Sequence, residues 1–226
     1  MTVTAQKLKS WTGRWSLLVL GMFFSSCGIA CVAQAQLGTT PISSTPYVFA
    51  DITGLTFGQT TFIVNVVFVF LEWVMLRKLF PLTNLCQIPS VWVFGLFIDL
   101  GMRLLAPTAS WAVSQGWAAQ AVMSLAGNVI LALGIVMQVE SKTLVQPGEG
   151  VVLAASVRFK KPFGSLKIVN DVLLVILAVV LGVVFLGGPD GVREGTLVSA
   201  LMVGLCVKGW YWLLACVRKP ASGGKA

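Results

Sequence analysis

The chain of 226 residues contains no histidine. It therefore lacks the most common ligand of catalytic zinc and haem iron, and the base that usually activates a serine or cysteine nucleophile. The five cysteines are odd in number and show no CxxC spacing, so packing explains them better than a metal or redox site. No GxxxxGK[ST] string occurs either. We therefore expect that the protein is not an enzyme and that it binds no metal or other cofactor.

Charged residues are also scarce, at 11%, whereas 57% of residues are apolar and the mean hydropathy is +0.89. A soluble domain of this length would not have such a composition. A helix that crosses a bilayer needs about 20 predominantly apolar residues. The sequence predicts an all-α membrane protein with six such segments, near residues 15–36, 58–77, 87–106, 119–139, 167–187 and 195–216.

The basic residues predict the orientation. They gather before the first segment, after the second, between the fourth and fifth, and in the tail, which indicates that both the N-terminus and the C-terminus are cytoplasmic. The net charge of +8 is then a topological bias that also suits anionic lipid headgroups, and we expect no nucleic-acid partner. The cytoplasmic ends would be residues 1–14 and 217–226.

A set of residues, among them glycines and prolines that mark breaks in helices, recurs at a constant offset of 106 residues. Gly28-Ile29, Pro41, Phe57-Gly58 and Asn65 return as Gly134-Ile135, Pro147, Phe163-Gly164 and Asp171. The pattern predicts two three-helix repeats, 15–106 and 119–216, joined by an external linker at 107–118. Because each copy has an odd number of spans, the second would enter the membrane from the opposite side, as in many secondary transporters.

Each repeat is broken by a polar stretch that then becomes apolar. The breaks read LGTTPISSTPYVFADITG and VQPGEGVVLAASVRF, and each contains a proline suited to a first helical position. One interpretation makes them re-entrant half-helices whose N-termini converge near the midplane and bind substrate; the other makes them interfacial helices on surface loops. In the first interpretation, hydroxyl groups near Pro41 bond the free amides, and a dipole holds Glu149 charged as a cation or proton site. The predicted substrate-binding residues are Thr40, Pro41, Ser43, Ser44, Asn65, Gly148, Glu149, Gly150 and Asp171.

Ionisable residues within apolar segments are expensive and are functional candidates by default. Asp99 and Lys208 occupy matching places in the third and sixth segments, so they either form an ion pair opened by substrate or each reach an interface. Arg193 and Glu194 are either an external gate pair or charges at a helix start.

Two further acidic residues have candidate partners close in sequence. Asp171 lies one helical turn after Lys167, so the two side chains are expected to be within reach of each other. Glu72 is expected to pair with Arg77 at the cytoplasmic interface.

Long ordered strings between Gly28 and Lys208 resemble the bacterial YczE/YyaS/YitT-type integral membrane proteins. Among them are LGTTPISSTPYV, GLTFGQTTFIVN, LCQIPSVWVFGLFIDL, QPGEG, FGSLKIVNDV and GVREGTLVSALMVGLCVK. The resemblance implies a duplicated, six-span protein of the bacterial inner membrane, from a group described as permeases of unknown substrate. Most of the candidate residues named above fall within these strings.

Together these features predict a small secondary transporter for an anionic or zwitterionic metabolite, with alternating access at the repeat interface and assembly as a homo-oligomer. Glu149, or the Asp99 and Lys208 pair, would couple protons or ions. Two rival functions stay open: a non-transporting scaffold or accessory subunit of a partner enzyme, and a substrate-binding subunit for a separate ATPase.

Overall fold

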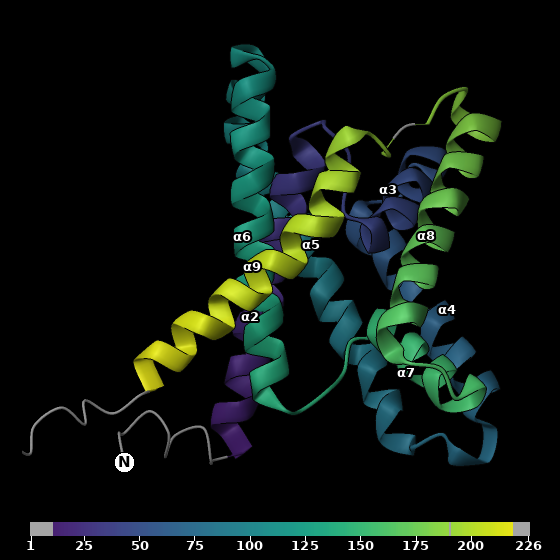
Figure 1. The fold of residues 1–226 in the computed structure, drawn as a ribbon. Helices are drawn as coiled ribbons and strands as arrows, with labels where there is room; N and C mark the ends of the chain where they lie inside the picture. The colour runs from purple at the N-terminus through teal and green to yellow at the C-terminus, as the bar shows by residue number, and fades with distance from the viewer. Residues whose placement is uncertain (1–10, 190, 219–226) are drawn as a thin grey trace, which may run out of the picture.

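The computed structural model describes residues 11–189 and 191–218, and every regular element in that part of the chain is helical (Figure 1). The elements are α2 (Trp11–Gln34), α3 (Pro41–Thr53), α4 (Phe57–Leu76), η1 (Arg77–Leu79), η2 (Leu82–Cys86), α5 (Gln87–Gln115), α6 (Trp117–Ser141), α7 (Pro147–Phe159), α8 (Phe163–Leu181), η3 (Gly182–Leu186) and α9 (Glu194–Arg218). The expected tails at 1–14 and 217–226 lie mostly outside the described residues.

Five helical stretches of the described chain are long and apolar enough to cross a membrane: 11–34, 82–115, 117–141, 163–186 and 194–216. They correspond to five of the six expected spans. The remaining expected span, 58–77, corresponds to α4, which is not among these five stretches. The segment 107–118 is not an extended linker, because α5 runs through Pro107 to Gln115 and only Gly116 separates it from α6. The protein is therefore an all-helical, multi-pass membrane protein.

Both breaks form helices of 13 residues, and each begins at the expected proline, Pro41 or Pro147. Proline is suited to this place because its missing N–H would have no partner in the first turn. Helix α3 ends where Gly54, at φ 70°, donates its N–H to the Ala50 carbonyl. Such a left-handed cap favours glycine and stops the helix sharply. The next helix of each half then begins at Phe57 or Phe163, again 106 residues apart.

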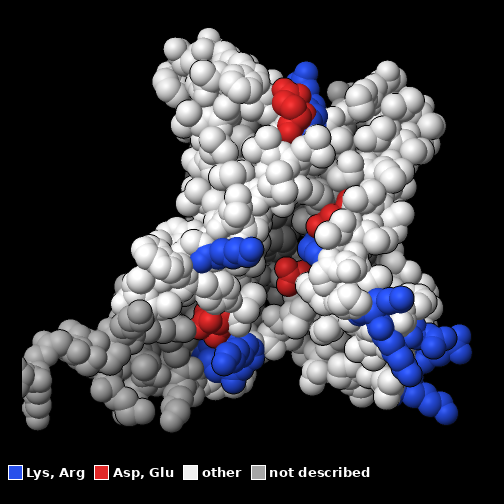
Figure 2. Space-filling model, in the orientation of Figure 1, with Lys and Arg blue, Asp and Glu red and all other residues white. Residues whose placement is uncertain are grey.

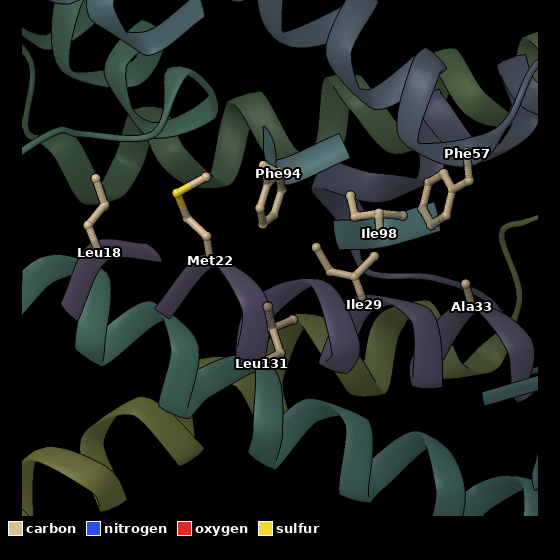
Figure 3. Packing of buried hydrophobic residues seen from close by; sticks show 8 residues of the cluster. All are labelled: Leu18, Met22, Ile29, Ala33, Phe57, Phe94, Ile98 and Leu131. Atoms are coloured by element: carbon tan, nitrogen blue, oxygen red, sulfur yellow. The ribbon is translucent and has the colours of Figure 1, made fainter. Parts of the chain in front are cut away.

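The centre of the fold is a close crossing of α2 and α6. A Cβ atom added to Gly28 would lie 2.6 Å from the Leu131 Cα and 2.7 Å from the Gly127 carbonyl oxygen. Such contacts need small residues, which in membranes allow helix backbones to approach and gain dispersion energy. Figure 3 shows the apolar core on one side of this crossing, where α2, α4, α5 and α6 contribute Leu18, Met22, Ile29, Ala33, Phe57, Phe94, Ile98 and Leu131.

The remaining helices pack both between the two halves of the chain and within each half. Helix α4 packs against α7, and α3 packs against α8. Each of the short helices α3 and α7 is thus held by a long helix from the other half of the chain. Helix α5 packs on α2, and α9 packs on α6. Figure 1 shows α9 diverging from α8.

Candidate functional site

A cavity of about 520 Å³ lies where the two halves of the chain meet. Its walls come from α2, α3, α4 and α5 in the first half and from α6, the 142–146 connection and the start of α7 in the second. Figure 2 shows that the corresponding face is hollowed at its centre, with acidic and basic side chains close to the recess. Cavities of this size hold small organic ligands.

Most of the cavity wall is apolar, and Ile29, Ile42, Phe68, Phe94 and Leu131 are representative. Phe68 belongs to a second core cluster that joins α4 to α7 and α8. The cavity can therefore bury an aliphatic or aromatic body, and orientation must come from its few polar groups.

Two glutamines form the main polar network of this wall. The Gln138 amide donates to Ser25 Oγ at 2.7 Å and to the Gly21 carbonyl at 3.2 Å. Gln146 in turn donates from its Nε2 to the Gln138 Oε1. Since Gln138 is buried and bonded on both sides, the network holds its orientation without a ligand.

Glu149 is the acidic residue of the cavity wall, on the first turn of α7. Its side chain is half-buried, and the carboxylate has no hydrogen bond or ion pair with any described residue. The N-terminal end of a helix carries positive partial charge, which favours a carboxylate at this position. Glu149 therefore offers a negative group that is available to a ligand.

Three other predicted substrate-binding residues also line the cavity: Ser43, Asn65 and Gly148. Ser43 Oγ accepts a hydrogen bond from Thr40 Oγ1 at 2.9 Å, and the Asn65 amide donates to the Thr61 carbonyl at 2.8 Å. These bonds leave the Ser43 hydroxyl proton and the Asn65 Oδ1 for a ligand.

The structure differs from the sequence prediction at the start of α3. Thr40 precedes α3 but makes no capping bond to its amides, and the Ser44 hydroxyl donates back to the Pro41 carbonyl at 2.7 Å. Thr40, Pro41 and Ser44 are buried and are not part of the cavity wall. Because these hydroxyl groups bond to each other and to a carbonyl, the expected bonds from hydroxyl groups to the free amides of α3 are not formed.

The remaining predicted binding residues, Gly150 and Asp171, also lie away from the cavity wall. Asp171 forms an ion pair with Lys167 at 2.9 Å, which confirms the expected pairing across one helical turn.

Asp99 and Lys208 do not form the predicted ion pair. The Asp99 carboxylate accepts hydrogen bonds from Thr56 Oγ1 at 2.6 Å and from the Gly58 N–H at 2.7 Å, at the start of α4. Two donors and the positive helix end hold this carboxylate in place. Lys208 lies exposed on α9. Asp99 thus joins α5 to α4.

Arg193 and Glu194 also do not pair with each other in the described structure. The Arg193 guanidinium donates to the Gln36 carbonyl at 2.8 Å, which ties the start of α9 to the end of α2. Glu194 is exposed in the first turn of α9, as expected for a charge at a helix start. A smaller, polar cavity of about 230 Å³ lies beside Arg193, between the 33–39 segment and α3.

Glu72 does not pair with Arg77 either, because its carboxylate is buried and bonded to the Asn84 amide at 2.9 Å. Its other close neighbour is Gly150, which lies far away in sequence. No local pattern could have revealed that contact. Gln138 and Gln146 were likewise not predicted, although a glutamine in the apolar stretch 119–139 was a usable signal.

Comparisons with known proteins give one match. Neither the curated proteins nor the solved structures contain a match to this chain. The model of a protein family matches residues 12–211, which is most of the chain. The chain therefore belongs to the Family of unknown function (DUF6198).

Proposed function

We propose that the protein is a permease that binds a small amphipathic molecule in the cavity between its two halves. The observation that carries this proposal is a mostly apolar cavity of about 520 Å³ with a carboxylate, Glu149, that has no partner among the described residues. A scaffold protein has no need for such a group in a space of ligand size. The resemblance to YczE/YyaS/YitT-type permeases supports the same function.

The charges of the wall define the class of ligand. An anion alone would be repelled by Glu149, whereas a ligand amine would form a charge-assisted hydrogen bond with it. Lys142 also lines the cavity, and its side chain is exposed, so it can meet a carboxylate at the rim. A zwitterion with an apolar body therefore suits this cavity better than a simple anion.

Alternating access would follow from two inverted repeats. The helix starts at Pro41 and Phe57 recur at Pro147 and Phe163, and the packing of α3 on α8 mirrors the packing of α7 on α4. In repeats of this kind the two halves exchange conformations, which opens a central site first to one side and then to the other.

The two halves differ at one pair of equivalent contacts. Gly58 meets Gly95 where α4 crosses α5, and a Cβ atom on Gly95 would lie 2.6 Å from the Gly58 carbonyl oxygen. Gly164 on α8 lies 106 residues after Gly58, and Gly204 on α9 lies 109 residues after Gly95, the offset that also relates Asp99 to Lys208. At Gly164 and Gly204 a Cβ atom would have nothing within 4 Å. We take the structure as the state in which the first half is closed and the second is open.

A binding and uptake experiment tests the proposal. Purified protein is screened by thermal shift against amino acids with apolar side chains, primary amines and carboxylates of matched size, and the best compound is tested for uptake into proteoliposomes. We expect stabilisation by the zwitterions, reduced at least tenfold in apparent affinity in Glu149→Gln, since a charged hydrogen bond contributes about 1.5–3 kcal/mol.

The matched control is Glu194→Gln, which removes an exposed carboxylate outside the cavity. It should bind and transport as the wild type does. Binding that is equal in both variants would contradict the role of Glu149. No stabilising compound and no uptake by the folded wild type would contradict the permease and favour the scaffold or accessory-subunit function.

A further inference from the structure

Glu72 is the most deeply buried carboxylate of the described chain, with 1% of its surface exposed near the end of α4. Asn84 donates to its Oε2 at 2.9 Å, but its Oε1 is buried without any hydrogen-bond partner. An unsatisfied buried carboxylate oxygen is costly and needs an explanation.

Glu72 lies where four elements meet. Asn84 belongs to η2, and Gln87, at the start of α5, lies within hydrogen-bonding reach of the carboxylate. From α7, Gly150 lies directly against the carboxylate, since a Cβ atom there would be 2.7 Å from the Glu72 Cδ. Gln87 is itself buried, at 2% exposure, and its Oε1 also has no partner.

No cation among the described residues balances the Glu72 carboxylate, which forms no ion pair there. The elements that pack around it supply few charges along their length: Arg77 and Lys78, which are exposed, Asp51 on α3, Asp99 and Arg103 on α5, and Glu149 and Arg158 on α7. An isolated buried charge costs several kcal/mol, so the neutral acid is the favoured form at this position.

A single proton would remove the unbalanced charge of Glu72. Bound to Oε1, the carboxylate oxygen without a hydrogen-bond partner, it would turn the buried anion into a neutral acid. Asn84 would continue to donate to Oε2. The ionised state thus leaves a buried charge without a cation, and the protonated state does not.

The first turn of α7 separates Glu72 from the cavity. Gly148 and Glu149 line the cavity, whereas the next residue, Gly150, contacts the Glu72 carboxylate. A change of charge at Glu72 would draw in water or donors and move this turn, and the same turn carries the carboxylate that faces the ligand.

We propose that Glu72 is a proton-binding site that couples proton uptake to the ligand cavity through the first turn of α7. This role rests on the permease function proposed above, although proton binding itself does not require it. Proton release would ionise Glu72 directly against Gly150 and shift α7. The residue is a coupling site and does not touch the transported molecule.

Infrared spectroscopy tests proton binding without any ligand. At neutral pH the wild type should show the C=O stretching band of a protonated carboxylic acid, shifted in D₂O, and Glu72→Gln should lose it. Glu194→Gln is the matched control and should keep the band. Gln87→Leu removes a hydrogen-bond donor close to the carboxyl group and should move the band to higher frequency, which gives a second readout if Glu72→Gln does not fold.

The coupling is tested in proteoliposomes with the compound found in the thermal-shift screen. Glu72→Gln should retain ligand exchange when the pH is equal on both sides of the membrane. Its uptake driven by a pH gradient should be at least tenfold lower than that of the wild type.

A wild type without the infrared band, or with a band that survives Glu72→Gln, would overturn the proton site. Stabilisation of the wild type by NaCl over KCl that Glu72→Gln abolishes would assign Na⁺ instead of a proton. If no compound is bound or transported while the band is present as expected, the permease function fails and the proton site stands.

Discussion

Gly58 and Gly164 occupy the second position of α4 and α8, but a methyl group added at each would meet different surroundings. At Gly58 the new Cβ would lie 2.7 Å from the Asp99 Cγ and from the Gly95 carbonyl carbon. At Gly164 it would have no atom within 4 Å. We expect Gly58→Ala to destabilise the protein and Gly164→Ala to leave its stability unchanged or slightly raised.

The magnitude follows from the contacts. Ordinary carbon contacts lie at about 3.5–4.0 Å, so atoms near the new methyl group must move by about 1 Å. Gly95 cannot move without its helix, and Asp99 can withdraw only by giving up its bond to the Gly58 N–H. Overpacking costs about 1–3 kcal/mol, and a hydrogen bond to a charged group about 1.5–3 kcal/mol. Because both glycines sit at the same helical position, the gain in helix propensity cancels between the variants.

The difference of about 2.5–6 kcal/mol corresponds to a melting temperature that is lower by about 5–24 °C in Gly58→Ala than in Gly164→Ala. The assay is thermal unfolding of the purified variants in one detergent, followed by tryptophan fluorescence and by loss of the monodisperse peak in size-exclusion chromatography. Gly95→Ala and Gly204→Ala form a second matched pair with the same expected order. Equal destabilisation of both members of each pair would refute the reasoning, because α8 and α9 would then be in contact in the resting protein.

Two further predictions address neighbouring features. Asp99→Ala should lower the free energy of unfolding by about 2–4 kcal/mol, because Thr56 and the Gly58 amide lose a charged acceptor. In the same melting assay, Lys208→Ala on exposed α9 should stay within about 0.5 kcal/mol of the wild type. If α8 and α9 close during transport, Gly164→Leu should fold normally and lose most of its uptake activity. The control Gly209→Leu, at another open position of α9, should transport normally. Normal uptake by Gly164→Leu would contradict closure at this contact.

The local features of the fold were predictable from sequence because they depend on local chemistry. Pro41 and Pro147 marked the starts of α3 and α7, and Lys167 and Asp171 pair because one helical turn brings them together. Helix length was less predictable: Pro107 lies within α5 and does not end it. Packing around α5 evidently outweighs the cost of a proline in a helix interior.

Long-range partners were not predictable from sequence. Opposite charges at Asp99 and Lys208 suggested an ion pair, but the sequence gives no information on which helix ends each side chain will reach. In the structure the start of α4 supplies Asp99 with two donors at short distance. A close neighbour of the Glu72 carboxylate is a glycine, Gly150, which has no side chain to signal an interaction. Contacts in which one partner is backbone leave no trace in a pattern of charges.

The same contrast supports the proposal of a closed first half and an open second half. In the first half Asp99 places negative charge at the positive N-terminus of α4, which holds α5 against it. The second half has Lys208 at the matching place, and a cation would be repelled by the positive start of α8. In the proposed transport cycle, closure of α8 on α9 would then carry an electrostatic cost that the first half does not have. A ligand or an anionic group that neutralises Lys208 would lower this cost and favour the closed second half.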